Sequence, residues 1–188
     1  MMSRNKIIIG ALSLGILAGG LLFFRSSEIS DLSFNLANIF SSQDPKIPGD
    51  SGEFGVYSNP DYGFSFEYPA DMQIMELDEV AGKIILGEGP QGAFQIFIMP
   101  FDEPGPLTAE RIKKDLPNLT MKNPSPSKIN EVEAVSFIGS GGDIKTAELW
   151  FVSPKDPYPH GNYLYQFTTK LENANFIEEI METWKFLQ

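Results

Sequence analysis

The sequence predicts an α+β domain with a central antiparallel sheet, preceded by an amino-terminal transmembrane helix. From residue 57 onward, apolar and polar residues mostly alternate at the two-residue period of strands. Helical spacing of apolar residues returns in two places, near residues 108–117 and 173–184. Several of the segments between the strands are short and rich in turn residues, which favours antiparallel neighbours.

The transmembrane helix is predicted from an uncharged apolar run over residues 7–24. A helix of this length crosses a hydrocarbon core of roughly 30 Å. Arg4 and Lys6 precede the run and Arg25 alone follows closely, a bias that places the amino terminus in the cytoplasm. Residues 1–25 are therefore expected to be a single-pass anchor in the plasma membrane, with the rest of the chain outside the cytoplasm.

Two further possibilities depend on small residues in this run. Ala18 and Gly20 fit a signal-peptide cleavage site, and cleavage near Gly20 would release a secreted protein. The apolar run continues past that site, which favours an uncleaved anchor. Ala11, Gly15 and Gly19 recur every four residues, a spacing that lets two membrane helices approach closely and predicts a weak homodimer.

Residues 26–56 are expected to connect the anchor to the domain. Ile29, Leu32, Leu36 and Ile39 fall at helical spacing, so a short helix is predicted close to the membrane. Residues 41–55 are dominated by serine, proline and glycine and are expected to be a linker. The globular domain is expected to occupy residues 57–188.

Composition limits the kinds of partner and chemistry. The chain has no cysteine, which excludes disulfides, thiolate metal sites and cysteine nucleophiles. After residue 25 it holds eleven basic and 25 acidic residues, a net charge of −14. So acidic a domain argues against binding to nucleic acid and against lying flat on anionic lipid.

The first half of the domain contains four predicted strands and a helix. Thr108 is a suitable N-cap, Ile112 and Leu116 share one helical face, and Pro117 ends the segment. Residues 118–127 are expected to be an irregular loop. The predicted strands cover residues 64–68, 72–77, 83–86 and 93–101, the last of which is apolar on both faces and is expected to be central.

The second half contains three predicted strands and a closing helix. The helix begins near Asn173 or Asn175, and its apolar stripe ends at Trp184, opposite a glutamate-rich face. The strands cover residues 129–138, 144–152 and 162–169.

Several of these segments resemble one family. A Tyr-Gly pair leads into Phe-Ser-Phe-Glu-Tyr-Pro at residues 64–69, Glu-Leu-Trp-Phe stands at 148–151 and Tyr-Leu-Tyr at 163–165. Phe-Ile-Glu-Glu-Ile at 176–180 then runs into Trp-Lys-Phe-Leu at 184–187. In this order the segments resemble the PsbP-like family, over about 130 residues from Tyr57 to the end. The resemblance implies a sheet with helices on both faces and an accessory or binding role; no metal-linked residue of the family matches here.

Motifs that carry chemistry have more ordinary interpretations in this chain. His160, the single histidine, lies between proline and glycine and is expected to be a solvated turn residue. Residues 139–146 end in Lys-Thr as a phosphate loop does, but Ile144 replaces the required glycine, so a hairpin turn is predicted. Trp150 is expected to be a core residue if helices cover both faces, and otherwise a partner contact.

Carboxylates are the remaining candidates for catalysis. Glu67, Glu131, Glu133 and Glu148 fall on predicted strands without a privileged pair, and a solvated sheet face is the expectation for them.

The sequence thus predicts no catalytic, cofactor-binding or metal-ligating residues. The leading hypothesis is a membrane-anchored, non-enzymatic binding or accessory module that engages a protein partner. Because the domain is acidic, a small-ligand or divalent-cation binding domain is the alternative. A hydrolase that uses carboxylates is the least favoured of the three hypotheses.

Overall fold

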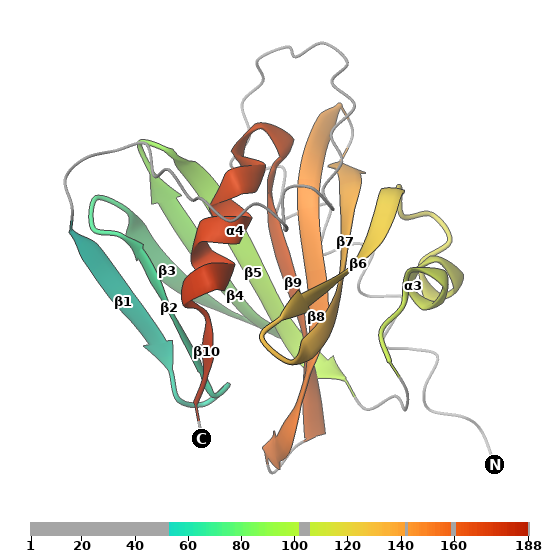
Figure 1. The fold of residues 1–188 in the computed structure, drawn as a ribbon, viewed down its shortest axis with the longest axis horizontal. Coiled ribbons are helices and arrows are strands. Elements are labelled where there is room, and N and C mark those ends of the chain that lie inside the picture. Colours follow the sequence, from blue (N-terminus) through green and yellow to red (C-terminus); the bar gives the residue numbers. More distant parts are fainter. Residues whose placement is uncertain (1–52, 102–105, 142, 159–160, 188) are drawn as a thin grey trace.

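The computed structural model describes residues 53–101, 106–141, 143–158 and 161–187, which form two antiparallel sheets and two α-helices (Figure 1). The smaller sheet has the order β1-β2-β10 and the larger one β3-β4-β5-β9-β8-β7-β6. The strands are β1 (Phe54–Asn59), β2 (Phe64–Pro69), β3 (Gln73–Glu79), β4 (Gly82–Gly89), β5 (Gly92–Phe101), β6 (Lys122–Ile129), β7 (Val132–Gly141), β8 (Ile144–Tyr158), β9 (Gly161–Lys170) and β10 (Lys185–Phe186).

The helices lie on opposite faces of the larger sheet. α4 (Ala174–Thr183), entered through the 3₁₀ turn η2 (Leu171–Asn173), packs on one face and also contacts the smaller sheet. α3 (Ala109–Asp115) packs on the other face, with Ile112 against Trp150. The predicted α+β class is confirmed, but the single predicted sheet is replaced by two.

The main core fills the space between the two sheets and α4. Period-two alternation sends Ile96, Ile98 and Phe167 into it, while Phe97 and Leu164 point to the opposite face. From α4 the apolar stripe Phe176, Ile177 and Ile180 packs on the same core. The larger sheet is therefore apolar on both faces, as expected for a sheet covered on both sides.

Trp184 stands at the centre of this core. It follows α4 directly, is 2% exposed and stacks on Phe64 with ring centroids 4.4 Å apart at 4°. On its other sides it stacks on Phe66 and meets Tyr165 edge to face. One indole thus joins α4, the smaller sheet and the larger sheet, and the chain continues from it into β10, which pairs with β2.

Three strands are not predicted by the sequence patterns. β1 begins at Phe54, inside the stretch expected to be linker, and β10 is too short to show a period. The expected loop over residues 118–127 is wrong in its second half, because β6 starts at Lys122. The single strand expected over residues 129–138 is divided by a turn at Asn130, whose φ of 52° is one that asparagine tolerates.

The prolines of β6 explain why it escaped prediction. β6 is an edge strand, and its pairing with β7 closes a two-residue turn between Ile129 and Val132. Counting back from that hydrogen-bonded pair, residue 126 is a position whose N–H would point away from β7, whereas residue 124 lies in the register shift between Lys122 and Ser125. Pro126 therefore removes no donor from the ladder, Pro124 stands where the pairing is already irregular, and neither proline offers an N–H to another strand.

The amino-terminal predictions lie outside the described residues. They include the transmembrane run, the cleavage site near Gly20, the small-residue spacing from Ala11 to Gly19 and the membrane-proximal helix. Among the residues that the structure describes, no helix is long and apolar enough to cross a membrane. The anchor stays a prediction.

Replacing Trp184 tests its central position. Trp184→Ala removes the ring that three elements share, and we expect the free energy of unfolding to fall by about 3–5 kcal/mol. Urea titration of the full-length chain, followed by circular dichroism, measures this. Leu187→Ala, at a 42% exposed position three residues on, should change the free energy of unfolding by less than about 0.5 kcal/mol. Similar losses in both variants would contradict the assignment.

Replacing the β6 prolines tests edge protection. The double variant Pro124→Ala/Pro126→Ala adds two N–H groups to the edge strand, of which the one at residue 126 points outward, so we expect stronger concentration-dependent self-association. Sedimentation velocity over a range of protein concentrations measures it. Pro117→Ala, in the exposed segment after α3, is the matched control and should sediment like the original chain. Unchanged sedimentation of the double variant would show that these prolines do not protect the edge.

Candidate functional site

A groove of about 690 Å³ lies between the start of α3, the edge strand β6 and the neighbouring strand β7. This volume falls in the range of pockets that bind small molecules or side chains of a partner. The start of α3 forms one wall of the groove. It is held by the Thr108 side chain, which caps the helix by accepting a hydrogen bond from the Arg111 N–H at 3.2 Å. The lining residues are Leu107, Thr108, Ala109, Glu110, Pro124, Ser125, Pro126, Ser127, Lys128, Glu133, Ala134 and Val135.

The groove combines apolar walls with a few charges. Lys128 and Glu133 face each other across the β6–β7 ladder, and Glu110 stands in the first turn of α3. Its hydroxyls belong to Ser125, Ser127 and Thr108, and no histidine or cysteine lines it. The groove lining thus offers apolar contacts, three hydroxyl groups and three charged side chains.

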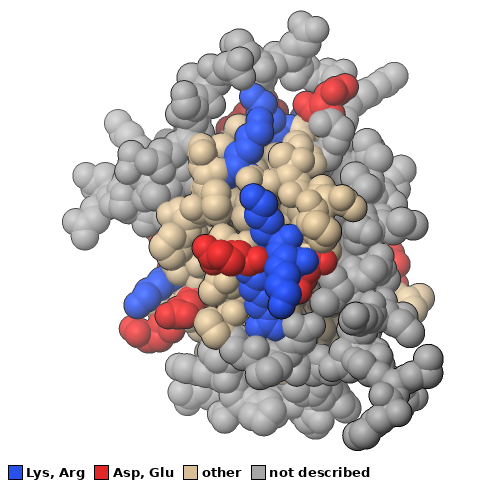
Figure 2. Space-filling view, turned by 90° about the vertical axis from the view of Figure 1, so that its right-hand side faces the viewer, with Lys and Arg blue, Asp and Glu red and all other residues tan. Residues whose placement is uncertain are grey.

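Basic side chains gather on the same face. Figure 2 shows a column of Lys and Arg running down its middle, with acidic side chains beside it. On α3 and β6 the exposed members are Lys113, Lys114, Lys122 and Lys128. Arg111 differs, since its guanidinium lies 4.9 Å from the centre of the Phe101 ring and 3.7 Å from a carboxylate oxygen of Asp115. Arg111 is thus held in place by neighbours within the fold.

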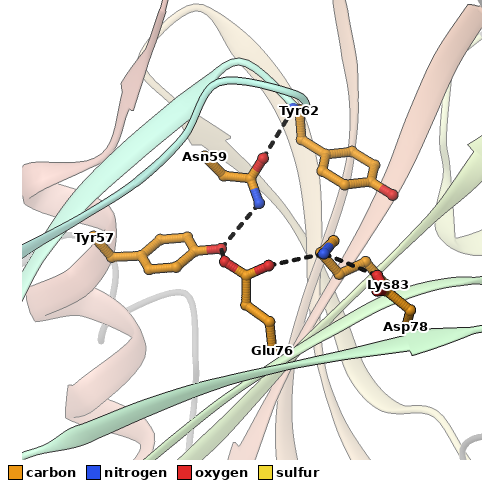
Figure 3. A network of polar contacts seen from close by, with 6 residues as sticks. All are labelled: Tyr57, Asn59, Tyr62, Glu76, Asp78 and Lys83. Carbon is orange, nitrogen blue, oxygen red and sulfur yellow. Dashed lines mark hydrogen bonds and ion pairs between the residues drawn. The ribbon is translucent and has the colours of Figure 1, made fainter.

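Apart from the groove, a polar cluster of Tyr57, Asn59, Glu76, Asp78 and Lys83 joins the two sheets (Figure 3). Tyr57 Oη on β1 donates to Glu76 Oε1 on β3 at 2.7 Å, and Asn59 Nδ2 donates to Tyr57 Oη at 3.0 Å. Lys83 Nζ on β4 lies 2.8 Å from Glu76 and 2.9 Å from Asp78. The hydrogen bond from Lys83 lowers the pKa of Glu76, whereas burial raises the pKa of Tyr57. With an ionised acid and a protonated phenol, the cluster ties the sheets together.

Glu148 is the centre of the other polar cluster, on the face of the larger sheet that α3 covers. Its side chain accepts from Thr146 Oγ1 at 2.7 Å, Thr168 Oγ1 at 2.7 Å and Trp150 Nε1 at 3.1 Å. Burial raises the pKa of Glu148 to about 7, against the opposing effect of these three donors. A side chain at Gly139 would collide with Thr146 Oγ1, 2.7 Å from an added Cβ, so the cluster is closely packed.

The expectation of a solvated sheet face is wrong for Glu148, which is 6% exposed. Its strand is covered on both sides, and donors on β8 and β9 replace water. Glu131 and Glu133 are exposed on the β6–β7 hairpin, while Glu67 is half-buried in the smaller sheet. The structure thus does not bring these carboxylates together as a catalytic pair.

Other sequence expectations have mixed outcomes. The hairpin over residues 139–146 is confirmed, with Gly139 opposite Thr146, and Trp150 is a core residue with 2% exposure. His160 lies outside the described residues. Among the described residues, no group of three or more histidine or acidic side chains is arranged to hold a metal ion, and cation binding stays a prediction.

Sequence reasoning missed the groove and both polar clusters. The proline–serine alternation in β6 was the available signal for the groove, but it was interpreted as loop. The clusters depend on partners far along the chain, such as Thr168 for Glu148 and Glu76 for Tyr57. Such pairs follow from strand order, which local patterns do not specify.

No protein-family model and no curated protein sequence matches the chain, whereas solved structures do. The solution structure of cyanobacterial PsbP, CyanoP, from Synechocystis matches 75% of this chain and 98% of its own, with 10% identity and a TM-score of 0.50. The domain has a PsbP-like fold. This confirms the fold that the sequence resemblance implied.

Two further solved structures match with lower TM-scores. A crystal structure from Bacteroides thetaiotaomicron matches 71% of this chain with 15% identity and a TM-score of 0.45, and this chain spans about half (48%) of its length. LpqN, involved in cell envelope biogenesis of Mycobacterium tuberculosis, matches 82% of this chain and 98% of its own, with 14% identity and a TM-score of 0.41. Likeness at these identities concerns the fold, and function must be argued from the site.

Glu148 predicts a pH dependence of stability. Its pKa of about 7 in the folded chain exceeds the ordinary 4.5, so its contribution is fully present below pH 4.5 and is lost as pH rises through 7. The loss is about 3 kcal/mol. Glu148→Gln should remove the part of this fall that is due to Glu148 in urea titrations at pH 4–8, leaving the parts due to Glu178 and Glu179, whose pKa values are also raised by burial. The exposed control Glu133→Gln should keep the fall, and an unchanged fall in Glu148→Gln would contradict the prediction.

Tyr57→Phe tests the tie between the sheets. It leaves Asn59 Nδ2, on a 4% exposed residue, without its acceptor and removes one donor from Glu76. We expect the free energy of unfolding to fall by about 1–2 kcal/mol, measured by urea titration. Tyr68→Phe also removes a tyrosine hydroxyl from the smaller sheet and is expected to cost less. An equal loss of unfolding free energy in both variants would mean that the Tyr57 hydroxyl does not stabilise the contact between the two sheets.

Proposed function

We propose that this chain is a membrane-anchored accessory module that binds a protein partner outside the cytoplasm, through the α3–β6 face. The observation that carries the proposal is the groove itself, a concave surface whose lining combines apolar residues with the exposed charges of Glu110, Lys128 and Glu133. Partner-binding surfaces combine an apolar centre with a charged rim in this way. The amino-terminal apolar run and the charges flanking it support the anchor and its orientation.

The chemistry of the described residues supports binding over catalysis. Glu148, a carboxylate that is only 6% exposed, accepts hydrogen bonds from three donors and is not part of the groove lining. The Tyr57 cluster is occupied in joining two sheets. The PsbP-like fold is compatible with this role. The sequence resemblance to the PsbP-like family implies an accessory or binding role.

Site-specific photocrosslinking in cells tests the proposal on the full-length chain. A photoreactive amino acid is placed at Ser127 in the groove and, as the matched control, at Asn175 on the exposed side of α4. We expect a reproducible adduct in the membrane fraction from Ser127 and none from Asn175. Absence of adducts from both positions, or an adduct from Asn175 alone, would overturn the proposal that this face binds a partner.

A further inference from the structure

We infer that the α3–β6 face binds an acidic segment of its partner, an extended stretch in which apolar side chains enter the groove and flanking carboxylates meet the lysines around it. The inference rests on the proposed function and specifies the chemistry of the partner.

The first argument is the separation of charge within the domain. Residues 106–129, which contain α3 and β6, hold five basic and two acidic residues. Residues 53–101 hold one basic and eight acidic residues. An acidic partner is thus attracted to the α3–β6 face and repelled by the region from β1 to β5, which directs its approach.

The second argument is that these lysines are available. Lys113, Lys114, Lys122 and Lys128 are exposed, and none forms an ion pair with a described residue. Lys83, by contrast, is held between two carboxylates. Basic side chains that carry no structural pairing on an otherwise acidic domain are the groups with which incoming carboxylates can pair.

The third argument concerns what the groove accepts. Pro124 and Pro126 on one wall face Leu107, with Ala134 and Val135 from β7, and these provide the apolar surface. The exposed carboxylates Glu110 and Glu133 line the groove beside Lys128, so incoming carboxylates must avoid them. The apolar lining suits apolar side chains of the segment, whereas its flanking carboxylates pair with Lys128 and with Lys122, which lies on β6 outside the lining.

The fourth argument concerns how the segment binds. β6 has no backbone N–H at Pro124 or Pro126, so a partner strand cannot extend the sheet there through a full ladder. Recognition must come from side chains, which makes it sensitive to salt and to charge reversal. A flat anionic bilayer would not enter a groove, and both a bilayer and a nucleic acid would face the acidic remainder of the domain.

Fluorescence labelling of the full-length chain in detergent tests the inference. The absence of cysteine allows a single label, at Ser127→Cys in the groove or at Asn175→Cys on α4 as the control. The probe is a peptide with two central leucines and four glutamates on each side; lysine replaces glutamate in the control peptide. Phosphatidylcholine–phosphatidylglycerol vesicles and a single-stranded oligonucleotide are tested separately.

We expect the label at Ser127 to respond to the glutamate peptide, less strongly as salt rises, and the label at Asn175 to stay unchanged. Lys128→Glu and Lys122→Glu should each weaken binding about 3- to 10-fold. Lys185→Glu, the same change at an exposed lysine on β10, should leave affinity unchanged. Thermal unfolding confirms that the variants are folded.

Equal loss in Lys128→Glu and Lys185→Glu, or equal binding of the lysine peptide, would overturn the inference, and so would tighter binding of the vesicles or oligonucleotide. Crosslinking separates this failure from failure of the proposed function. An adduct from Ser127 that persists in Lys122→Glu/Lys128→Glu keeps the proposed function and overturns the acidic-segment inference. Absence of any adduct overturns the proposed function itself.

Discussion

Burial of the Trp184 indole is the interaction on which the rest of the structure depends. The smaller sheet has three strands, one of them two residues long, and a sheet of that size is not stable in water unless its apolar face is covered. Trp184 stacks on Phe64 and Phe66 from that sheet and meets Phe151 and Tyr165 of the larger one edge to face. Because it follows α4 directly, the same contact fixes the end of the helix.

The polar connections are arranged around this apolar centre. The backbone N–H of Glu67 donates to Thr183 Oγ1 at 2.9 Å, and Asn130 Nδ2 donates to the Trp184 carbonyl oxygen at 3.1 Å. The first bond joins β2 to the end of α4, and the second joins the same point to the β6–β7 turn. Hydrogen bonds of this kind add little net energy each, but a partly buried group that is left unpaired carries a cost, so these bonds favour one packing of the elements.

The sequence predicts the elements with strong periods and misses those whose form depends on neighbours. Thr108 before Ile112 and the stripe that ends at Trp184 are local patterns, and both helices are found where they predict. β6 is different, because proline disfavours a strand in general and is tolerated at an edge, a property that strand order decides. Glu148 was expected in water for the same reason, since its donor Thr168 becomes a neighbour only through pairing of β8 with β9.

The order of strands also fixes the distance between the first described strand and the groove. The chain enters the domain at β1, which Tyr57 ties to β3 at one edge of the larger sheet, and β6 forms the opposite edge (Figure 1). Six steps between neighbouring strands, at about 4.8 Å each, separate these edges by roughly 29 Å. If the protein is held by its amino-terminal end, the groove lies on the side of the domain away from that end. Rotation of the domain about its first strand would then displace the groove much farther than it displaces β1.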